Sequence, residues 1–187
     1  MTTTSPLEPQ FDPQHHALRL FQQRPRHRRL CRADLEARPT AHRPLTMETT
    51  PSPINDAATA FAAIALAAVS WDGVLTQAGT RALRHTLDYR HPFSEYSDER
   101  MVRLMDQLLF QLRRLGAQHL MVEAAAALNP DQRATAFAVA AEIMRSDGRL
   151  LADERNILSN LGGVLELEEE FQAGLIAAMG VLHADLV

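Results

Sequence analysis

The chain has 187 residues, of which 46% are hydrophobic and 5% aromatic. One domain with a core of Ala, Leu and Met is therefore expected, and these residues favour helices over sheets. The formal net charge is −4, and the acidic excess lies in residues 47–187, with eleven Arg against nineteen acids. This charge argues against nucleic-acid binding by the folded part, because binding to phosphates needs a basic surface. Cys31 is the only cysteine, which excludes an intramolecular disulfide and a cysteine-based zinc site.

No apolar segment approaches the roughly eighteen uninterrupted residues that a membrane-spanning helix needs. The apolar stretch from Phe61 to Trp71 is short and lies too far from the start to be a signal peptide. We therefore expect a cytoplasmic protein with no stable membrane insertion.

Residues 1–54 differ from the rest in composition. They contain eight of the ten prolines and the Arg-rich cluster from Arg24 to Arg32. Such a segment cannot bury enough apolar surface to offset the entropy of ordering, so a disordered Pro/Arg-rich tail is expected. A basic arm for RNA or lipid is the functional alternative. Met47 also opens a stretch typical of a translation start, so residues 1–46 are open to interpretation as an over-extended gene start.

From residue 55 to residue 187 the hydrophobic period is helical, and no strand pattern occurs. The strongest local signal is Asn129-Pro130-Asp131-Gln132, where Asn caps a helix, Pro takes its first position and Gln closes a capping box. The sequence predicts about seven helices in a single compact domain. The first has the apolar stripe Phe61, Ile64, Ala65 and Ala68, the second begins at about residue 76 and ends before His91-Pro92, and the third covers about 97–115 and stops at Gly116. The fourth covers about 118–128, and the fifth begins at Pro130. The sixth covers about 152–161 and stops at Gly162-Gly163, and the seventh covers about 167–183.

One segment recurs. Asp72-Gly73 and Asp147-Gly148 each follow an apolar helix, and each precedes an apolar residue two positions after the Gly and then a new helix. The Gly supplies a positive φ for a sharp turn at the helix end. Glu154 lies seven residues after Asp147, so the two carboxylates can converge on one point. The sequence therefore predicts an internal pseudo-symmetric Asp-Gly helix-turn-helix repeat.

The pattern Asp-Gly-x-aliphatic-Ser/Thr-x-x-Glu, present twice at a separation of 75 residues in a helical chain, resembles the TerB-like tellurite-resistance family. The stretches 60–69 and 134–140 are also similar to its cyanobacterial members, and the resemblance covers about residues 55–187. It implies a compact helical fold with internal pseudo-symmetry, in which acidic residues of both repeats line a divalent-cation site. It also implies a role in tellurite and other chemical stress without a known catalytic activity.

Asp72, Asp147 and Glu154 are the residues that match the family's acidic positions, and Glu142 and Asp153 are weaker candidates nearby. Three carboxylates can hold a hard cation with waters in the remaining positions. The identity of the metal is left open among calcium, zinc and manganese. Two positions depart from the family pattern, because Gly79 stands where a Glu is expected and Leu151 where Ser or Thr is expected. The lost Glu predicts weaker metal binding, or none.

Each candidate ligand also has a structural explanation. Asp72 and Asp147 can hydrogen-bond local amides of their turns. Glu154 stands at a position where Glu completes a capping box and interacts favourably with the helix dipole. We expect capping to explain Glu154 less well than usual, because the cap position is Leu151, which cannot accept a bond.

The sequence thus predicts a non-enzymatic divalent-cation-binding module with protein partners and a role in stress response. The alternative is a metal-free protein–protein interaction scaffold with a degenerate acidic site. A hydrolase that uses metal-bound water is disfavoured, because no nucleophile comes with a matching base, no His shows ligand spacing and no phosphate-binding Gly loop occurs.

Overall fold

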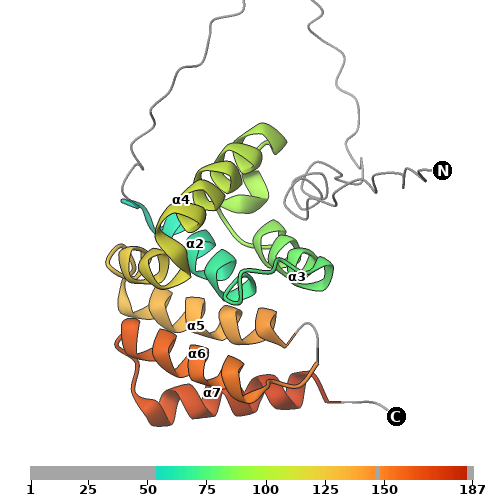
Figure 1. The fold of residues 1–187 in the computed structure, drawn as a ribbon, viewed down its shortest axis with the longest axis vertical. Coiled ribbons are helices and arrows are strands. Elements are labelled where there is room, and N and C mark those ends of the chain that lie inside the picture. The colour runs from blue at the N-terminus through green and yellow to red at the C-terminus, as the bar shows by residue number, and fades with distance from the viewer. Residues whose placement is uncertain (1–53, 146–147, 185–187) are drawn as a thin grey trace, which may run out of the picture.

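The computed structural model describes residues 54–145 and 148–184, and in these ranges it contains six α-helices, a 3₁₀ helix and no strand (Figure 1). The predicted all-helical class is confirmed for this part of the chain. Residues 1–53, including the expected disordered tail, lie outside the described residues. The elements are α2 (Ala57–Val69), α3 (Gln77–Asp88), η1 (Phe93–Glu95), α4 (Asp98–Ala125), α5 (Pro130–Met144), α6 (Ala152–Val164) and α7 (Glu169–Leu182).

Helix α2 is the central element of the core. It contacts α3, α4 and α5, and Figure 1 shows it between α4 and α5. Every residue from Ala60 to Ala68 is buried, although the sequence pattern predicted one apolar stripe. The other face, with Ala63, Leu66 and Ala67, is buried too, and its alanines let neighbouring helices approach closely. On the far side of α5 lie α6 and α7, which contact α5 and each other (Figure 1).

The predicted break at Gly116 is present inside α4. Residues 98–125 are counted as one element, but Gly116 has non-helical backbone angles, with φ 81° and ψ 164°, and two helical segments meet there at a kink. Glycine adopts these angles because it has no Cβ. With α4 counted as one element, the described residues contain six α-helices, and about seven were expected.

The predicted stop of α6 at Gly162-Gly163 was wrong, because the helix continues to Val164. It ends in a Schellman motif, in which the Leu167 amide donates to the Gly162 carbonyl at 3.0 Å and the Glu166 amide donates to the Gly163 carbonyl at 3.1 Å. Gly162 has a packing role instead. A Cβ built there would lie 2.1 Å from Cδ of the buried Gln172 in α7.

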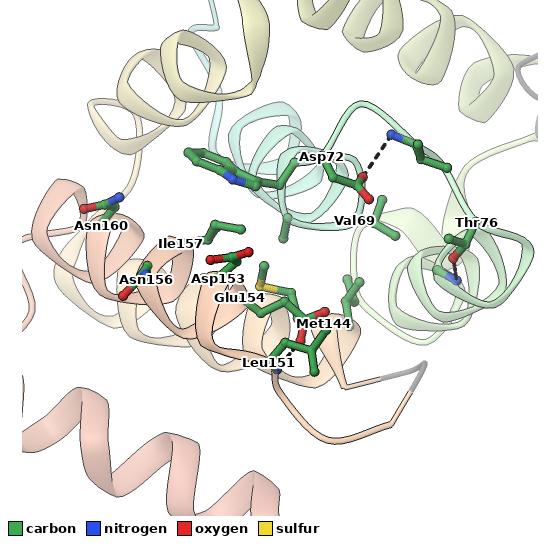
Figure 2. A pocket seen from close by; sticks show the side chains of 15 residues that line it. Val69, Asp72, Thr76, Met144, Leu151, Asp153, Glu154, Asn156, Ile157 and Asn160 are labelled. Carbon is green, nitrogen blue, oxygen red and sulfur yellow. Dashed lines mark hydrogen bonds between the residues drawn. The ribbon is translucent and has the colours of Figure 1, made fainter.

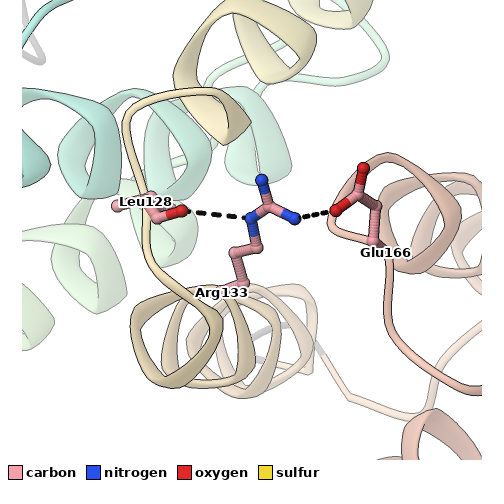
Figure 3. A network of polar contacts seen from close by, with 3 residues as sticks. All are labelled: Leu128, Arg133 and Glu166. Carbon is pink, nitrogen blue, oxygen red and sulfur yellow. Dashed lines mark hydrogen bonds and ion pairs between the residues drawn. The ribbon is translucent and has the colours of Figure 1, made fainter.

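Glu166 occupies the position after the cap of α6 where glycine is usual, and its φ is +57°. Figure 3 shows its partner, Arg133 near the start of α5, which forms an ion pair with the Glu166 carboxylate. Arg133 Nε also donates to the Leu128 carbonyl at 3.1 Å. One guanidinium therefore joins the segment before α5 to the turn between α6 and α7.

Replacing Glu166 by Gly is expected to leave the free energy of unfolding unchanged or to raise it by up to about 2 kcal/mol. The exposed ion pair is worth about 0–1 kcal/mol, and relief of a left-handed backbone with a Cβ gains about 1–2 kcal/mol. Glu166→Ala loses the pair and keeps the Cβ, so it should be less stable than wild type. Urea unfolding of the two variants checks this order, and an Ala variant more stable than the Gly variant would contradict it.

None of the helices in residues 54–145 and 148–184 is long and apolar enough to span a membrane.

Candidate functional site

A pocket of about 550 Å³ lies between the turn that follows α2 and the start of α6 (Figure 2). Its walls come from four helices and their turns, so it joins the two segments in which the Asp-Gly motif occurs. The residues that line it are Ala68, Val69, Trp71, Asp72, Val74, Thr76 and Gly79 from the first segment, and Ile143, Met144, Leu151, Asp153, Glu154, Asn156, Ile157 and Asn160 from the second.

Asp72 lies in the turn after α2, is exposed, and lines this pocket. Its Oδ1 accepts a hydrogen bond from the Val74 amide at 2.9 Å, which is the local bond expected of a turn carboxylate. Gly73 follows with φ +80°, and Gly148 of the second motif has φ +131°. Both glycines therefore have the positive φ that the sequence predicted. The turn bond of Asp72 uses one oxygen of the carboxylate.

Glu154 lies in the first turn of α6, and its Oε2 accepts a hydrogen bond from the Leu151 amide at 2.7 Å. This bond is the glutamate half of a capping box. The other half is missing, since the Leu151 side chain has no polar atom. The expectation that Leu151 makes capping a poor explanation was wrong, because the bond from the cap residue to Glu needs only the backbone N–H of that residue.

The other candidate ligands have different positions. Asp153 is exposed and lines the pocket, whereas Glu142 is exposed on α5 and does not contribute to the lining. Asp147 lies outside the described residues. Within the part of the chain that the structure describes, no three His, Cys, Asp or Glu side chains are grouped closely enough to hold a metal ion. The structure therefore brings Asp72, Asp153 and Glu154 to one pocket but not to one metal-binding cluster.

Gly79, at the position where the resemblance implies a glutamate, is closely packed. It is the third residue of α3, and its amide donates to Oγ1 of Thr76, the cap of that helix, at 3.0 Å. Gly79 is buried, and a Cβ built there would lie 2.2 Å from Cγ2 of Val69 in α2. The missing side chain therefore lets the start of α3 pack directly on the end of α2.

Asn156 and Asn160 were not predicted as site residues, and both line the pocket from α6. Their signal in the sequence was the spacing 153, 156, 157 and 160, which places four residues on one helical face. The hydroxyl of Thr76 accepts a hydrogen bond from the Gly79 amide at the start of α3.

The described lining contains three carboxylates and no Arg or His, beside apolar side chains such as Val69, Trp71 and Ile157. Such a pocket can bind a ligand that has an apolar body and a positive charge. This description of the pocket rests on its lining residues and not on membership of a family. Comparison of the chain with protein-family models, with curated proteins and with solved structures gives no match.

Proposed function

We propose that this chain is a non-enzymatic binding module of the TerB-like kind, whose pocket binds an apolar side chain and an adjacent positive charge on a protein partner. The observation that carries this proposal is the lining of the pocket, in which Asp72, Asp153 and Glu154 lie beside apolar side chains and no Arg, Lys or His is present among the described lining residues. The association with tellurite and chemical stress comes from the resemblance.

The chemistry of the pocket divides into two contributions. Burial of an apolar side chain against Val69, Met144 and Ile157 contributes affinity in proportion to the area removed from water. The carboxylates of Asp72 and Glu154 select Lys or Arg and disfavour acidic segments. Trp71 is half-buried in the same lining, and its ring can add a cation–π contact.

Trp71 also offers a direct assay, because it is the only tryptophan in the chain. We expect its fluorescence to change on titration with a blocked peptide that contains Leu-Arg, and to change little with the matched Leu-Gln peptide. Glu154→Gln should weaken binding of the Leu-Arg peptide about fivefold, the equivalent of about 1 kcal/mol. Glutamine retains the bond to the Leu151 amide, so the fold should be unaffected. The matched control is Glu142→Gln, outside the pocket, which should bind the peptide as wild type does.

A divalent cation is the second candidate ligand, because the resemblance implies a cation site at Asp72, Asp147 and Glu154, of which Asp72 and Glu154 line the pocket. Calorimetric titration with calcium, zinc and manganese chlorides tests it. A cation that binds only the folded state raises the melting temperature by mass action. An increase that Asp147→Asn abolishes would favour the metal over the peptide. If neither peptide nor metal changes the fluorescence or the melting temperature, both functions are wrong.

A further inference from the structure

The pocket between the turn after α2 and the start of α6 is acidic and has an apolar rim (Figure 2). Asp72, Asp153 and Glu154 are the charged residues of its described lining, and no Arg, Lys or His is among them. Val74 is 54% exposed and Leu151 is 69% exposed, so apolar surface continues outward from the pocket. A ligand that fits this surface has apolar and cationic side chains next to each other.

The Arg-rich cluster from Arg24 to Arg32, which we call the basic segment, has matching chemistry. Its nine residues include five Arg and His27, and no Asp or Glu. Leu30 stands between Arg29 and Arg32, so an apolar side chain has cationic neighbours on both sides. The basic segment lies outside the described residues, and its composition is the one that the pocket selects.

We infer that the basic segment binds in this pocket of its own chain, with Leu30 against the apolar lining and its arginines beside the carboxylates. The inference rests on the proposed function, because the segment offers the pocket the same ligand chemistry that a protein partner would. Complementary charge favours the contact, since five arginines meet the three carboxylates of the described lining. The contact is autoinhibitory, because a partner must displace the segment before it can bind.

The connection between the basic segment and the helices is long enough for this contact. The described chain starts at Ile54, whose amide donates to Oε1 of Glu123 in α4 at 3.1 Å, so this end of the connection is fixed. The pocket lies at the far end of α2, and the 13 residues of that helix span about 20 Å. Residues 33–53 form the connection, and a chain of that length reaches up to about 70 Å.

Binding within one chain needs only a modest intrinsic affinity. A ligand on a connection that spans both sites has an effective concentration on the order of 1 mM. With an intrinsic Kd on the order of 100 µM, the segment would occupy the pocket in roughly nine chains out of ten. An external peptide would then bind about tenfold more weakly than it binds an open pocket.

Nucleic acid is the other partner that an arginine-rich segment fits, because Arg neutralises phosphates. The charge of the rest of the chain opposes it. Residues 47–187 hold eleven Arg against nineteen acids, so they repel phosphates and attract the basic segment. Phosphate contacts also leave Leu30 without a role, whereas the pocket offers it an apolar surface.

Two residues of the chain report the contact directly. Cys31, in the basic segment, is the only cysteine, and Trp71, in the pocket lining, is the only tryptophan. A nitroxide attached to Cys31 quenches tryptophan at short range, so the labelled full chain should lose roughly half of its fluorescence or more at nine-tenths occupancy. Glu154→Gln should restore part of the loss, and the matched control Glu142→Gln, outside the pocket, should restore none.

Equal fluorescence with and without the nitroxide would overturn the inference and favour nucleic acid as the partner of the basic segment. A loss that grows with protein concentration would show that the segment of another copy binds, and it would overturn the contact within one chain.

Calorimetric titration with the blocked Leu-Arg peptide separates this inference from the proposed function. With Arg29→Gln and Leu30→Ser combined, the full chain should bind the peptide about tenfold more tightly than wild type. The matched control combines Arg19→Gln and Leu20→Ser, the same two changes ten residues earlier in the chain, and should bind as wild type does. One affinity for all three chains would overturn the inference and leave the proposed function standing. No binding to any of them would overturn the proposed function, and the inference with it.

Discussion

Ala63→Gln is expected to lower the free energy of unfolding by about 2–6 kcal/mol. Ala63 lies on the face of α2 opposite the stripe of Phe61, Ile64, Ala65 and Ala68, and it is 0% exposed. The larger side chain has no space there, and overpacking costs about 1–3 kcal/mol. Its amide would also be buried without hydrogen-bond partners, at a cost of about 1–3 kcal/mol more.

Urea unfolding monitored by circular dichroism measures this effect. The matched control is Ala173→Gln, an exposed alanine in α7, which should change the free energy of unfolding by no more than about 0.5 kcal/mol. If the two variants were equally stable, α2 would have an open face and the arrangement of helices around it would be wrong. An amphipathic α2, as the apolar stripe alone suggests, predicts that result.

The second large effect is expected at Gly79. Gly79→Ala should lower the free energy of unfolding by about 1–3 kcal/mol, because the new Cβ collides with Cγ2 of Val69. Valine is stiff at χ1 in a helix, so it cannot easily turn away. Gly79→Glu should cost at least as much as Gly79→Ala. It is therefore not expected to restore a family-type site, even though Glu is the residue that the family pattern has at this position.

A double-mutant cycle identifies the collision as the cause. Val69→Ala removes Cγ2, so Gly79→Ala should cost clearly less in the Val69→Ala background than in wild type. A coupling energy of about 0.5–3 kcal/mol is typical of residues in contact. Additive free energies would show that Val69 is not the obstacle. The control is Gly163→Ala, where a Cβ meets no atom within 4 Å and the higher helix propensity of Ala should stabilise α6.

Features that depend on neighbours in the sequence could be predicted well. The capping box at the start of α5 is present with both bonds at 2.9 Å, from the Gln132 amide to the Asn129 side chain and from the Asn129 amide to the Gln132 side chain. The positive φ of Gly73 and Gly148 and the turn bond of Asp72 are local in the same sense. These signals could be recognised because the interacting groups lie within three residues of each other.

Features that depend on distant packing could not be predicted. A glycine in a helix has the same sequence signature whether it stops the helix, as expected at Gly162, or makes room for a side chain 10 residues later, as it does for Gln172. The burial of α2 on all sides requires helices that begin 41 and 73 residues after its own start at Ala57. Hydrophobic periodicity reports only the composition of a face and not the number of neighbours that cover it.

The candidate site was predictable in part. Asp72 and Glu154 were identified from the motif and Asp153 as a weaker candidate nearby, and all three line one pocket. Asn156 and Asn160 were missed, because they became relevant only when α6 was placed against the turn after α2. The internal repeat, the metal and the stress role stay predictions, and Asp147 is the residue on which the metal hypothesis now depends.

The central position of α2 has a consequence for synthesis on the ribosome. Its nine buried residues leave the exit tunnel before α4 and α5, the helices that contact it most. Translation proceeds at about 5–20 residues per second, so the 75 residues between the ends of α2 and α5 take roughly 4–15 s. During that interval an uncharged, alanine-rich helix has only some of its native partners, because α3 and α4 are made before α5. We therefore expect nascent chains that stall before Met144 to be bound by chaperones, and chains that extend through α5 to be released.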